Sequence, residues 1–235
     1  MRRAVVNVGT GSIYQRGTNT LRNSVAKYGN CDFVSWQDPL PKDWPKHSDV
    51  AYGFKAFSLR EASKDHDLLL WADSSVVAIR SMEPLWEKIE REGAFVPLNG
   101  WFNSEWTCDA AYEDLFPGVP LEEARERNKI PHAVATTFGM NLHSSVGNEL
   151  LSEYFRLANT RAFCGPWSNL DCPEHWQQDP SRMGHCGPPS VRGHRHDQSS
   201  LSVIAHRLGI TLTPCPEFFS YPPPAENTIL VNVGA

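Results

Sequence analysis

The sequence has no long apolar segment. No stretch approaches the roughly 18 consecutive apolar residues that a membrane-spanning helix needs, and the opening "MRRAVVNVGTGS" contains only a short apolar run. A secretory signal has a longer apolar core. These absences predict a cytoplasmic protein without a membrane span.

Paired cysteines and an excess of basic residues are also missing. The six cysteines are scattered and form no C-x-x-C pair, which favours reduced thiols over a disulfide framework. The formal net charge of −5 argues against a nucleic-acid-coating surface, although a nucleic acid could still be a local substrate. The composition is that of an ordinary globular chain, with 40% hydrophobic and 21% charged residues. Because no linker is evident, we expect one domain spanning residues 1–235.

The order of strand-like and helix-like segments indicates the fold class. In the first half, strand-like segments (4–8, 31–36, 67–72, 94–98) alternate with amphipathic helical segments (19–29, 52–66, 82–93). The second half adds strand-like segments (134–142, 228–234) and helical segments (144–159, 197–210) around a long irregular stretch (164–196). The alternation predicts an α/β domain with a mainly parallel central sheet flanked by helices.

One aspartate stands where such a sheet binds ligands. The run "DLLLWA" (67–72) is typical of a central strand buried on both faces, and Asp73 follows at its carboxyl end. A carboxylate there could hold a divalent cation, and the cation could hold phosphate oxygens. Alternatively, Asp73 caps a turn in which Ser74 and Ser75 make local hydrogen bonds. The residues alone leave both interpretations open.

Four segments, taken in order, resemble nucleotide-sugar-dependent glycosyltransferases of the GT-A fold. They are "NVGTGSIYQRGTNTLRNSV", "YGFKAFSLREASKDHDLLLWADSSV", "MEPLWEKIEREGAFV" and "GHRHDQSSLSVIAHRLGI". The resemblance covers most of residues 4–215 and is to poorly characterised members with a degenerate DxD motif. It implies a GT-A-like domain that transfers a hexosyl or pentosyl unit from a nucleotide-sugar, a UDP-sugar, to a hydroxyl acceptor. The acceptor could be a glycan, a protein, a small molecule or a modified nucleobase.

The resemblance also implies a divalent cation, Mn²⁺ or Mg²⁺, at Asp73. In this sequence Ser75 replaces the second carboxylate of the DxD motif, and serine is a weaker metal ligand. His194 or His196 could supply a further ligand, as a late histidine does in some GT-A enzymes. The alternative for both histidines is a solvated loop.

The same resemblance assigns the remaining site residues. Those expected to bind the nucleotide-sugar are Asn7, Thr10, Gly11, Tyr14, Lys55, Asp73, Ser74 and Ser75. Those expected to bind the acceptor are Trp101, Trp167, Asn169 and Gln198. Asp73 and Asp197 are the candidate catalytic residues; Asp197 would deprotonate the acceptor in an inverting enzyme or orient donor hydroxyls in a retaining one. Without the resemblance, Lys55 could be a surface lysine and Asp197 a helix cap.

Two other function classes stay open. Cysteine and histidine gather in one stretch, and both are zinc ligands, although the spacing matches no familiar finger: Cys164, Cys172, His175, His185, Cys186, His194 and His196. A non-catalytic nucleotide- or glycan-binding module is also compatible with the altered DxD motif. A dinucleotide-dependent dehydrogenase is disfavoured, because "GTGSIY" lacks the third glycine of the Rossmann fingerprint.

Overall fold

A five-stranded sheet forms the centre of the protein in a computed structural model that describes residues 1–167 and 186–234. Its strand order is β2-β1-β3-β8-β5, with β1 at Arg3–Gly9, β2 at Asp32–Gln37, β3 at Leu68–Ala72, β5 at Ala94–Phe95 and β8 at Thr137–Asn141. β1 pairs in parallel with β2 and β3, whereas β8 runs antiparallel to both β3 and β5. The mainly parallel sheet is therefore confirmed, with β8 as its reversed strand.

Two smaller sheets flank this one. The first has the order β10-β11-β4, with β4 at Val76–Ala78, β10 at Phe218–Ser220 and β11 at Thr228–Asn232. The second has the order β7-β6-β9, with β6 at Pro97–Phe102, β7 at Pro131–Ala133 and β9 at Thr213–Pro214. The first extends the fold beyond the carboxyl end of β3, since β4 follows that strand directly.

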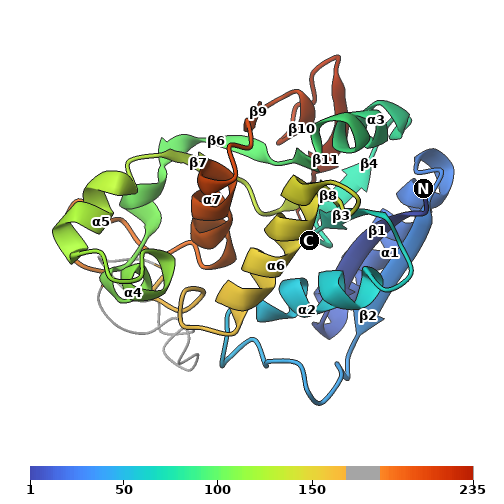
Figure 1. Ribbon diagram of the computed structural model, residues 1–235. Coiled ribbons are helices and arrows are strands. Elements are labelled where there is room, and N and C mark those ends of the chain that lie inside the picture. The colour runs from blue at the N-terminus through green and yellow to red at the C-terminus, as the bar shows by residue number, and fades with distance from the viewer. Residues whose placement is uncertain (168–185, 235) are drawn as a thin grey trace.

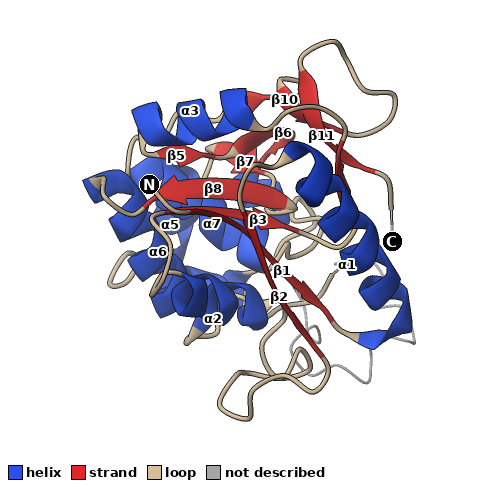
Figure 2. Ribbon diagram, turned by 90° about the vertical axis from the view of Figure 1, so that its right-hand side faces the viewer, coloured by secondary structure: helices blue, strands red, loops and turns tan. Residues whose placement is uncertain are grey.

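Helices cover both faces of the central sheet (Figures 1 and 2). α1 (Gly11–Tyr28) and α3 (Glu83–Glu92) share one hydrophobic cluster with one face of β3. α2 (Gly53–Ala62), α6 (Ser145–Ala158) and α7 (Asp197–Arg207) share the other cluster with its opposite face. Short helices lie between β6 and β7: η1 (Asn103–Trp106), η2 (Asp109–Ala111), α4 (Tyr112–Leu115) and α5 (Leu121–Arg127).

The alternation of side chains along β3 fixes the direction of Asp73. Leu68 and Leu70 belong to the cluster on the α1 face, whereas Leu69 and Trp71 belong to the cluster on the α2 face. Because side chains alternate with a period of two, the next residue on the α2 face is Asp73. The strand thus delivers a carboxylate toward α2 and α7 at its carboxyl end.

The predicted strands and helices are present, with several differences. The predicted strand 94–98 is divided between β5 and β6, which lie in different sheets, and the short strands β4, β7, β9 and β10 were not predicted. α1 begins at Gly11 rather than near residue 19, because its first turns are exposed and carry too few apolar residues to show a helical period. The short helices between residues 103 and 127 were not predicted, since none is long enough to show that period. Of the predicted irregular stretch, residues 164–167 and 186–196 carry no helix or strand, and 168–185 lie outside the described residues.

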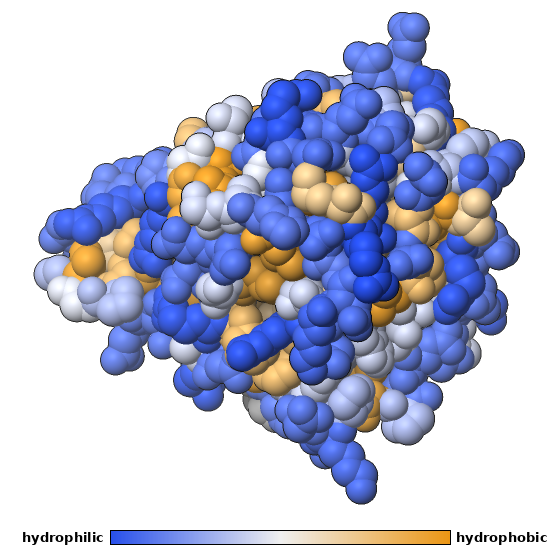
Figure 3. Space-filling view, turned by 45° about the vertical axis from the view of Figure 1, so that its right-hand side comes forward, coloured by the Kyte–Doolittle hydropathy of each residue, from blue (hydrophilic) through white to orange (hydrophobic). Residues whose placement is uncertain are grey.

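The surface is mostly polar. The face seen in Figure 3 is largely hydrophilic, with apolar side chains grouped in limited areas. In the part of the chain that the structure describes, no helix combines the length and apolar character needed to cross a membrane.

Candidate active site

Asp73 lies at the edge of the central sheet, and its carboxylate is held from two sides. Trp71, two residues earlier on the same face of β3, donates its indole N–H to Asp73 Oδ1 at 2.7 Å. Lys55 Nζ lies 3.0 Å from the same oxygen. Asp73 Oδ2 makes no hydrogen bond to any described residue, and 30% of the side chain is exposed. One carboxylate oxygen is thus fixed while the other is left for a ligand.

Lys55 connects three elements of the site. It projects from α2 with only 4% of its side chain exposed, and its Nζ lies 3.0 Å from both Asp73 Oδ1 and Asp197 Oδ2. The same ammonium donates to the carbonyl of Ala135 at 3.0 Å. The rings of Tyr52 and Trp71 lie 5.0 and 5.3 Å from it. Lys55 is therefore a buried, fully coordinated cation and not a solvated surface lysine.

Asp197 is the first residue of α7 and meets Lys55 from the opposite side. Its Oδ2 also accepts a hydrogen bond from the Tyr154 hydroxyl, on α6, at 3.0 Å. Burial raises the pKa of Asp197, and the Lys55 ammonium opposes that shift. Burial alone would lower the pKa of Lys55, but the carboxylates of Asp197 and Asp73 outweigh it and raise that pKa. We conclude that Lys55 stays protonated at neutral pH and that the two aspartates share its charge.

A cavity of about 390 Å³ opens beside Asp73 along the first strand–helix turn. Its walls come from the β1–α1 turn, from α2 with the segment before it, and from the β3–β4 turn: Val8, Thr10, Tyr14, His47, Tyr52, Phe54, Lys55, Trp71, Asp73, Ser74 and Ser75. Its volume lies within the range of small-ligand pockets.

A second cavity of about 170 Å³ adjoins the first. It shares Tyr52, Lys55 and Asp73 with the first cavity. Its other lining residues come from the segment after β7 and from the approach to α7: Ala135, Thr136, Trp167, Arg195, Asp197 and Gln198. The Lys55–Asp73 ion pair therefore stands at the junction of two hollows.

The residues predicted to meet the nucleotide separate into two groups. Thr10, Tyr14, Ser74 and Ser75 line the larger cavity, and Tyr14 is 54% exposed. Asn7 does not line it. Fully buried, Asn7 donates to the carbonyl of Ala72 at 2.7 Å and accepts from Thr18 Oγ1 at 2.7 Å.

Gly11 also lies outside the cavity wall, and its backbone explains why a glycine stands there. It has φ +75°, in the left-handed region, and its N–H donates to Asp38 Oδ2 at 2.6 Å. Asn7 and Gly11 thus shape the turn that carries Thr10 and Tyr14.

The two histidines predicted as metal ligands line neither cavity. His194 is fully buried: its Nδ1 accepts from the N–H of Cys108 at 3.3 Å, and its Nε2 lies 2.9 Å from the carbonyl of Ala162. His196 places its Nδ1 3.0 Å from the carbonyl of Phe163 and stacks on Trp167. Of the predicted metal ligands, only Asp73 faces the cavities.

At this site, the only predicted ligand that could bind a cation is the carboxylate of Asp73. Among the described residues, no group of three or more His, Cys, Asp or Glu side chains could hold a metal ion. Asp73 still offers one unoccupied carboxylate oxygen. A single carboxylate is sufficient for a magnesium- or manganese-type ion whose other ligands are water and substrate phosphates. The residues that the structure describes therefore fit a cation whose remaining ligands come from water and a bound molecule, because they supply only one carboxylate at this position.

The residues predicted to bind an acceptor are only partly brought together. Trp167 and Gln198 line the smaller cavity. Trp101 lies beyond it, where its ring stacks on Trp106 at 4.6 Å and is 38% exposed. Asn169 lies outside the described residues.

The cysteines give little support to a zinc site. Cys172, His175 and His185 lie outside the described residues. Among the described residues, no cysteine belongs to a group of three or more possible metal ligands. Burial raises the pKa of Cys108 to about 11 and that of Cys186 to about 12, as expected for thiols packed in apolar surroundings.

Several residues that build the site were not predicted from the sequence. Tyr52 lines both cavities and holds a left-handed backbone with φ +61°, which is uncommon for a non-glycine residue. Such strain at a cavity wall is a mark of functional sites. Trp71, Tyr154 and Arg195 also contact or line the site. Only Trp71 carried a sequence signal, because it precedes Asp73 by one period of the strand.

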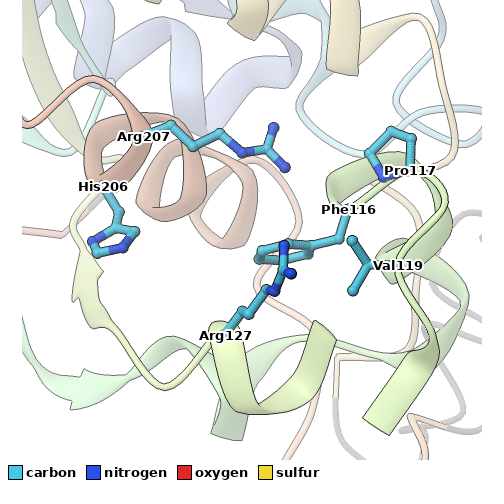
Figure 4. Close-up of a pocket in the computed structure, with 6 residues that line it drawn as sticks. All are labelled: Phe116, Pro117, Val119, Arg127, His206 and Arg207. Carbon is cyan, nitrogen blue, oxygen red and sulfur yellow. The ribbon is translucent and has the colours of Figure 1, made fainter. Parts of the chain in front are cut away.

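A larger hollow of about 540 Å³ lies at the other end of α7. The chain around α4 and α5 and the carboxyl end of α7 line it, with Phe116, Pro117, Val119, Arg127, His206 and Arg207 (Figure 4). With 11 residues, α7 spans about 16 Å between this hollow and Asp197. The hollow contains no carboxylate in its lining, and we place the candidate site at Asp73 instead.

Comparisons with known proteins identify the fold. No protein-family profile matches the sequence, and no curated protein does. A structural match with TM-score 0.55 and 9% identity covers 100% of this chain and 95% of a glycosyltransferase involved in glycosylation of the major capsid of PBCV-1. Mouse xyloside xylosyltransferase 1 matches with TM-score 0.51 and 9% identity, over 99% of this chain and 97% of that one.

A third match is to the bifunctional glycosyltransferase WbbM, with TM-score 0.52 and 10% identity. It covers 100% of this chain but only 46% of WbbM. The three similarities confirm the GT-A-like glycosyltransferase fold that the sequence predicts.

Proposed function

We propose that this protein is a glycosyltransferase that moves a hexosyl or pentosyl unit from a nucleotide-sugar, a UDP-sugar, to a hydroxyl acceptor. The observation that carries the proposal is the pair of adjoining cavities that share Tyr52, Lys55 and Asp73. They open at the carboxyl end of β3, where α/β sheets bind ligands. The similarity to glycosyltransferase structures supports glycosyl transfer in general.

The two cavities suit the two halves of such a reaction. The larger one offers the Tyr14 ring for stacking on a base and the hydroxyls of Thr10 and Ser75 for a ribose or phosphate. The smaller one, bounded by Asp197, Gln198 and Trp167, has room for a sugar unit. A donor that spans both would place its diphosphate beside Lys55 and Asp73.

The charges at the junction suit departure of a nucleoside diphosphate. In the transfer, the bond between the sugar C1 and the phosphate oxygen breaks, a bond from C1 to the acceptor oxygen forms, and the proton of the acceptor hydroxyl passes to the leaving diphosphate oxygen. Lys55 lies where the leaving diphosphate gains charge, and a fixed ammonium in a partly desolvated site stabilises that charge. Asp197 Oδ2 already accepts from Lys55 and Tyr154, which favours an orienting role toward donor hydroxyls over proton abstraction.

We further propose that Mn²⁺ or Mg²⁺ accompanies the donor. Asp73 Oδ2 would hold the ion together with the donor phosphates and water, with Ser75 in place of a second carboxylate. When bound, the ion would neutralise diphosphate charge. The cytoplasmic location remains a prediction from the sequence.

The test is a panel of nucleotide-sugars, each with and without manganese, measured by thermal stabilisation and by release of nucleoside diphosphate. We expect a UDP-sugar to raise the melting temperature and to be turned over. Asp73→Asn should abolish turnover and leave the fold intact, because Lys55 keeps Asp197 as its partner. The matched control is Asp65→Asn, an exposed residue before β3, which should not change turnover. Full activity in Asp73→Asn would refute the proposed site.

A non-catalytic nucleotide- or glycan-binding module is the second candidate. The absence of the second DxD carboxylate at Ser75 favours it. A pure binder would be stabilised by a nucleotide-sugar but would release no nucleoside diphosphate, either to water or to any acceptor. The same panel therefore separates the two functions.

A further inference from the structure

Arg195 is held in an unusual setting on the wall of the smaller cavity. Its guanidinium carbon lies 3.9 Å from the ring centre of Trp106 and 4.0 Å from that of Trp167. Its backbone N–H contacts the carbonyl of Trp106 at 3.1 Å and Ser199 Oγ at 3.2 Å. Two indole rings and an anchored backbone therefore fix the plane of this side chain.

In the part of the chain that the structure describes, the charge of Arg195 has no counter-charge. Among the described residues, no carboxylate pairs with it, and its Nη1 is buried without a hydrogen-bond partner. Other arginines near the surface behave differently: Arg192, in the same segment, pairs with Glu105 at 3.8 Å. Burial lowers the pKa of Arg195 to about 10, which still leaves it protonated at neutral pH. A guanidinium nitrogen buried without a partner is costly, and a ligand that supplies the missing partner is one physical reason for such a group in a half-buried side chain.

The neighbours of Arg195 do not supply that partner. Asp197 and Asp73 line the same cavity, but each directs one carboxylate oxygen at Lys55 Nζ, 3.0 Å away, and neither pairs with Arg195. Gln198 is also occupied: its Nε2 lies 3.1 Å from His132 Nδ1, and its Oε1 accepts from the N–H of Ala135 at 3.4 Å. The wall of the smaller cavity therefore carries one planar cation that forms no ion pair with a described residue.

We propose that the acceptor carries an oxyanion, a carboxylate or a phosphate, close to the hydroxyl that receives the sugar, and that Arg195 binds it. This inference rests on the proposed glycosyl transfer and adds a class of acceptor to it. Guanidinium groups bind carboxylate and phosphate through two parallel hydrogen bonds, and this geometry suits a side chain whose plane is already fixed.

The position of Arg195 favours the acceptor over the donor diphosphate. Arg195 lines only the smaller cavity, whereas the residues suited to a nucleotide line the larger one. Lys55 and Asp73 stand at the junction, where a diphosphate would lie. A second cation beyond the junction is placed for a charge on the other substrate.

The experiment compares neutral and charged sugars on protein saturated with UDP. The probes are methyl β-glucoside, methyl β-glucuronide and glucose 6-phosphate, with binding measured by calorimetry. We expect at least one charged sugar to bind about tenfold or more tightly than the glucoside. A preference for the glucuronide identifies a carboxylate acceptor, and a preference for the phosphate identifies a phosphorylated one.

Three variants test the role of Arg195. Arg195→Met should remove the preference for the charged sugar and leave the affinity for UDP unchanged. Arg195→Lys, which keeps the charge but not the planar group, should retain part of the preference and serves as a check on folding. Arg192→Met, a change in the same segment at an exposed arginine, should behave as the unmodified protein does.

The possible results distinguish failure of the anionic-acceptor proposal from failure of the proposed glycosyl transfer. Equal binding of charged and neutral sugars, or a preference that survives Arg195→Met, overturns the anionic acceptor while UDP binding leaves the proposed transferase intact. A loss of UDP affinity in Arg195→Met assigns this arginine to the donor and also overturns the inference. Failure of the unmodified protein to bind UDP or any nucleotide-sugar counts against the proposed function itself.

Discussion

Lys55 carries the positive charge that stabilises both Asp73 and Asp197. Its side chain is 4% exposed, and that of Asp197 is 5% exposed, so water screens this contact poorly. Removing one member of a buried ion pair leaves the other charge without compensation. From the sequence, Lys55 could only be proposed as a cation that offsets phosphate charge. Its burial was not predicted, because a lysine on an amphipathic segment is usually exposed.

The first prediction concerns this lysine. Lys55→Met should lower the free energy of unfolding by about 3–5 kcal/mol, since it leaves Asp73 and Asp197 without their shared cation. Adding Asp197→Asn to the variant should recover part of the loss, because it removes one of the two unpaired carboxylates. Urea unfolding of both variants measures the effect. If the single variant unfolds at the same urea concentration as the unmodified protein, Lys55 is not the central charge of this network.

The second prediction concerns the cation at Asp73. A single free carboxylate oxygen is a weak site, so Mn²⁺ alone should give no measurable stabilisation. Mn²⁺ together with UDP should stabilise the protein more than UDP does alone, because the phosphates complete the coordination of the ion. Thermal melting with each component singly and in combination checks this. Strong stabilisation by Mn²⁺ without nucleotide would point to a ligand set built from the chain itself.

At the scale of elements, the strand that precedes Asp73 could be predicted from the sequence, but the helices that contact this aspartate could not. "DLLLWA" predicted a buried strand because every residue in it is apolar apart from the first, and β3 is buried along its whole length. The sequence could not show that α2 would bring Lys55 to this strand or that α7 would bring Asp197. Those contacts join residues far apart in the chain, and no local pattern encodes them. Similarly, the sequence could not show that His194 Nε2 and His196 Nδ1 would each lie beside a backbone carbonyl, away from the two cavities.

α1 packs so closely against the β3–β4 turn that we expect a side chain at Gly17 to disturb both the helix and the turn. A Cβ atom on Gly17 would lie 2.2 Å from the carbonyl oxygen of Ser74, which is far inside contact distance. Gly→Ala inside a helix normally stabilises by roughly 0.5–1 kcal/mol. Here we expect the opposite sign, with lower stability and weaker UDP binding, since α1 must move away from the turn that holds Ser74 and Ser75.

Gly100→Ala is the matched control for this substitution. A Cβ at that position would meet no atom within 4 Å. Unfolding midpoints and UDP affinities of the two variants should therefore differ. Equal behaviour of both variants would show that contact between α1 and the turn is not needed for the site.

At the scale of the whole molecule, two separate cores explain how the sheet can position the site firmly. One core lies between the sheet and α1 with α3, and the other between the sheet and α2, α6 and α7. The three helices of the second core deliver Lys55, Tyr154 and Asp197, so this charged network is part of the packing that holds that face together. The α/β class and the succession of strands and helices along the chain followed from alternation in the sequence, but the strand order did not. The reversed direction of β8 did not, because hydrophobic patterns carry no information on strand direction.

Buried histidines should make the stability of the whole fold sensitive to acid. Burial, reinforced by the charge of Arg195, lowers the pKa of His132 to about 3, and burial lowers that of His194 to about 4. In the unfolded chain both should titrate near 6.5. Between these values the unfolded state binds more protons than the folded state, so stability is complete above about pH 6.5 and falls as the pH decreases. Each histidine should contribute a loss of about 1.4 kcal/mol between pH 7.5 and pH 5.5.

The last prediction isolates one of these groups. His132→Gln removes the titrating ring, so the loss of unfolding free energy between pH 7.5 and pH 5.5 should be smaller by about 1.4 kcal/mol than in the unmodified protein. His206→Gln, at an exposed position near the end of α7, should leave the loss unchanged. Urea unfolding at the two pH values measures both. An unchanged pH dependence in His132→Gln would mean that this ring is protonated as readily in the fold as in the unfolded chain, contrary to its burial between β6 and α7.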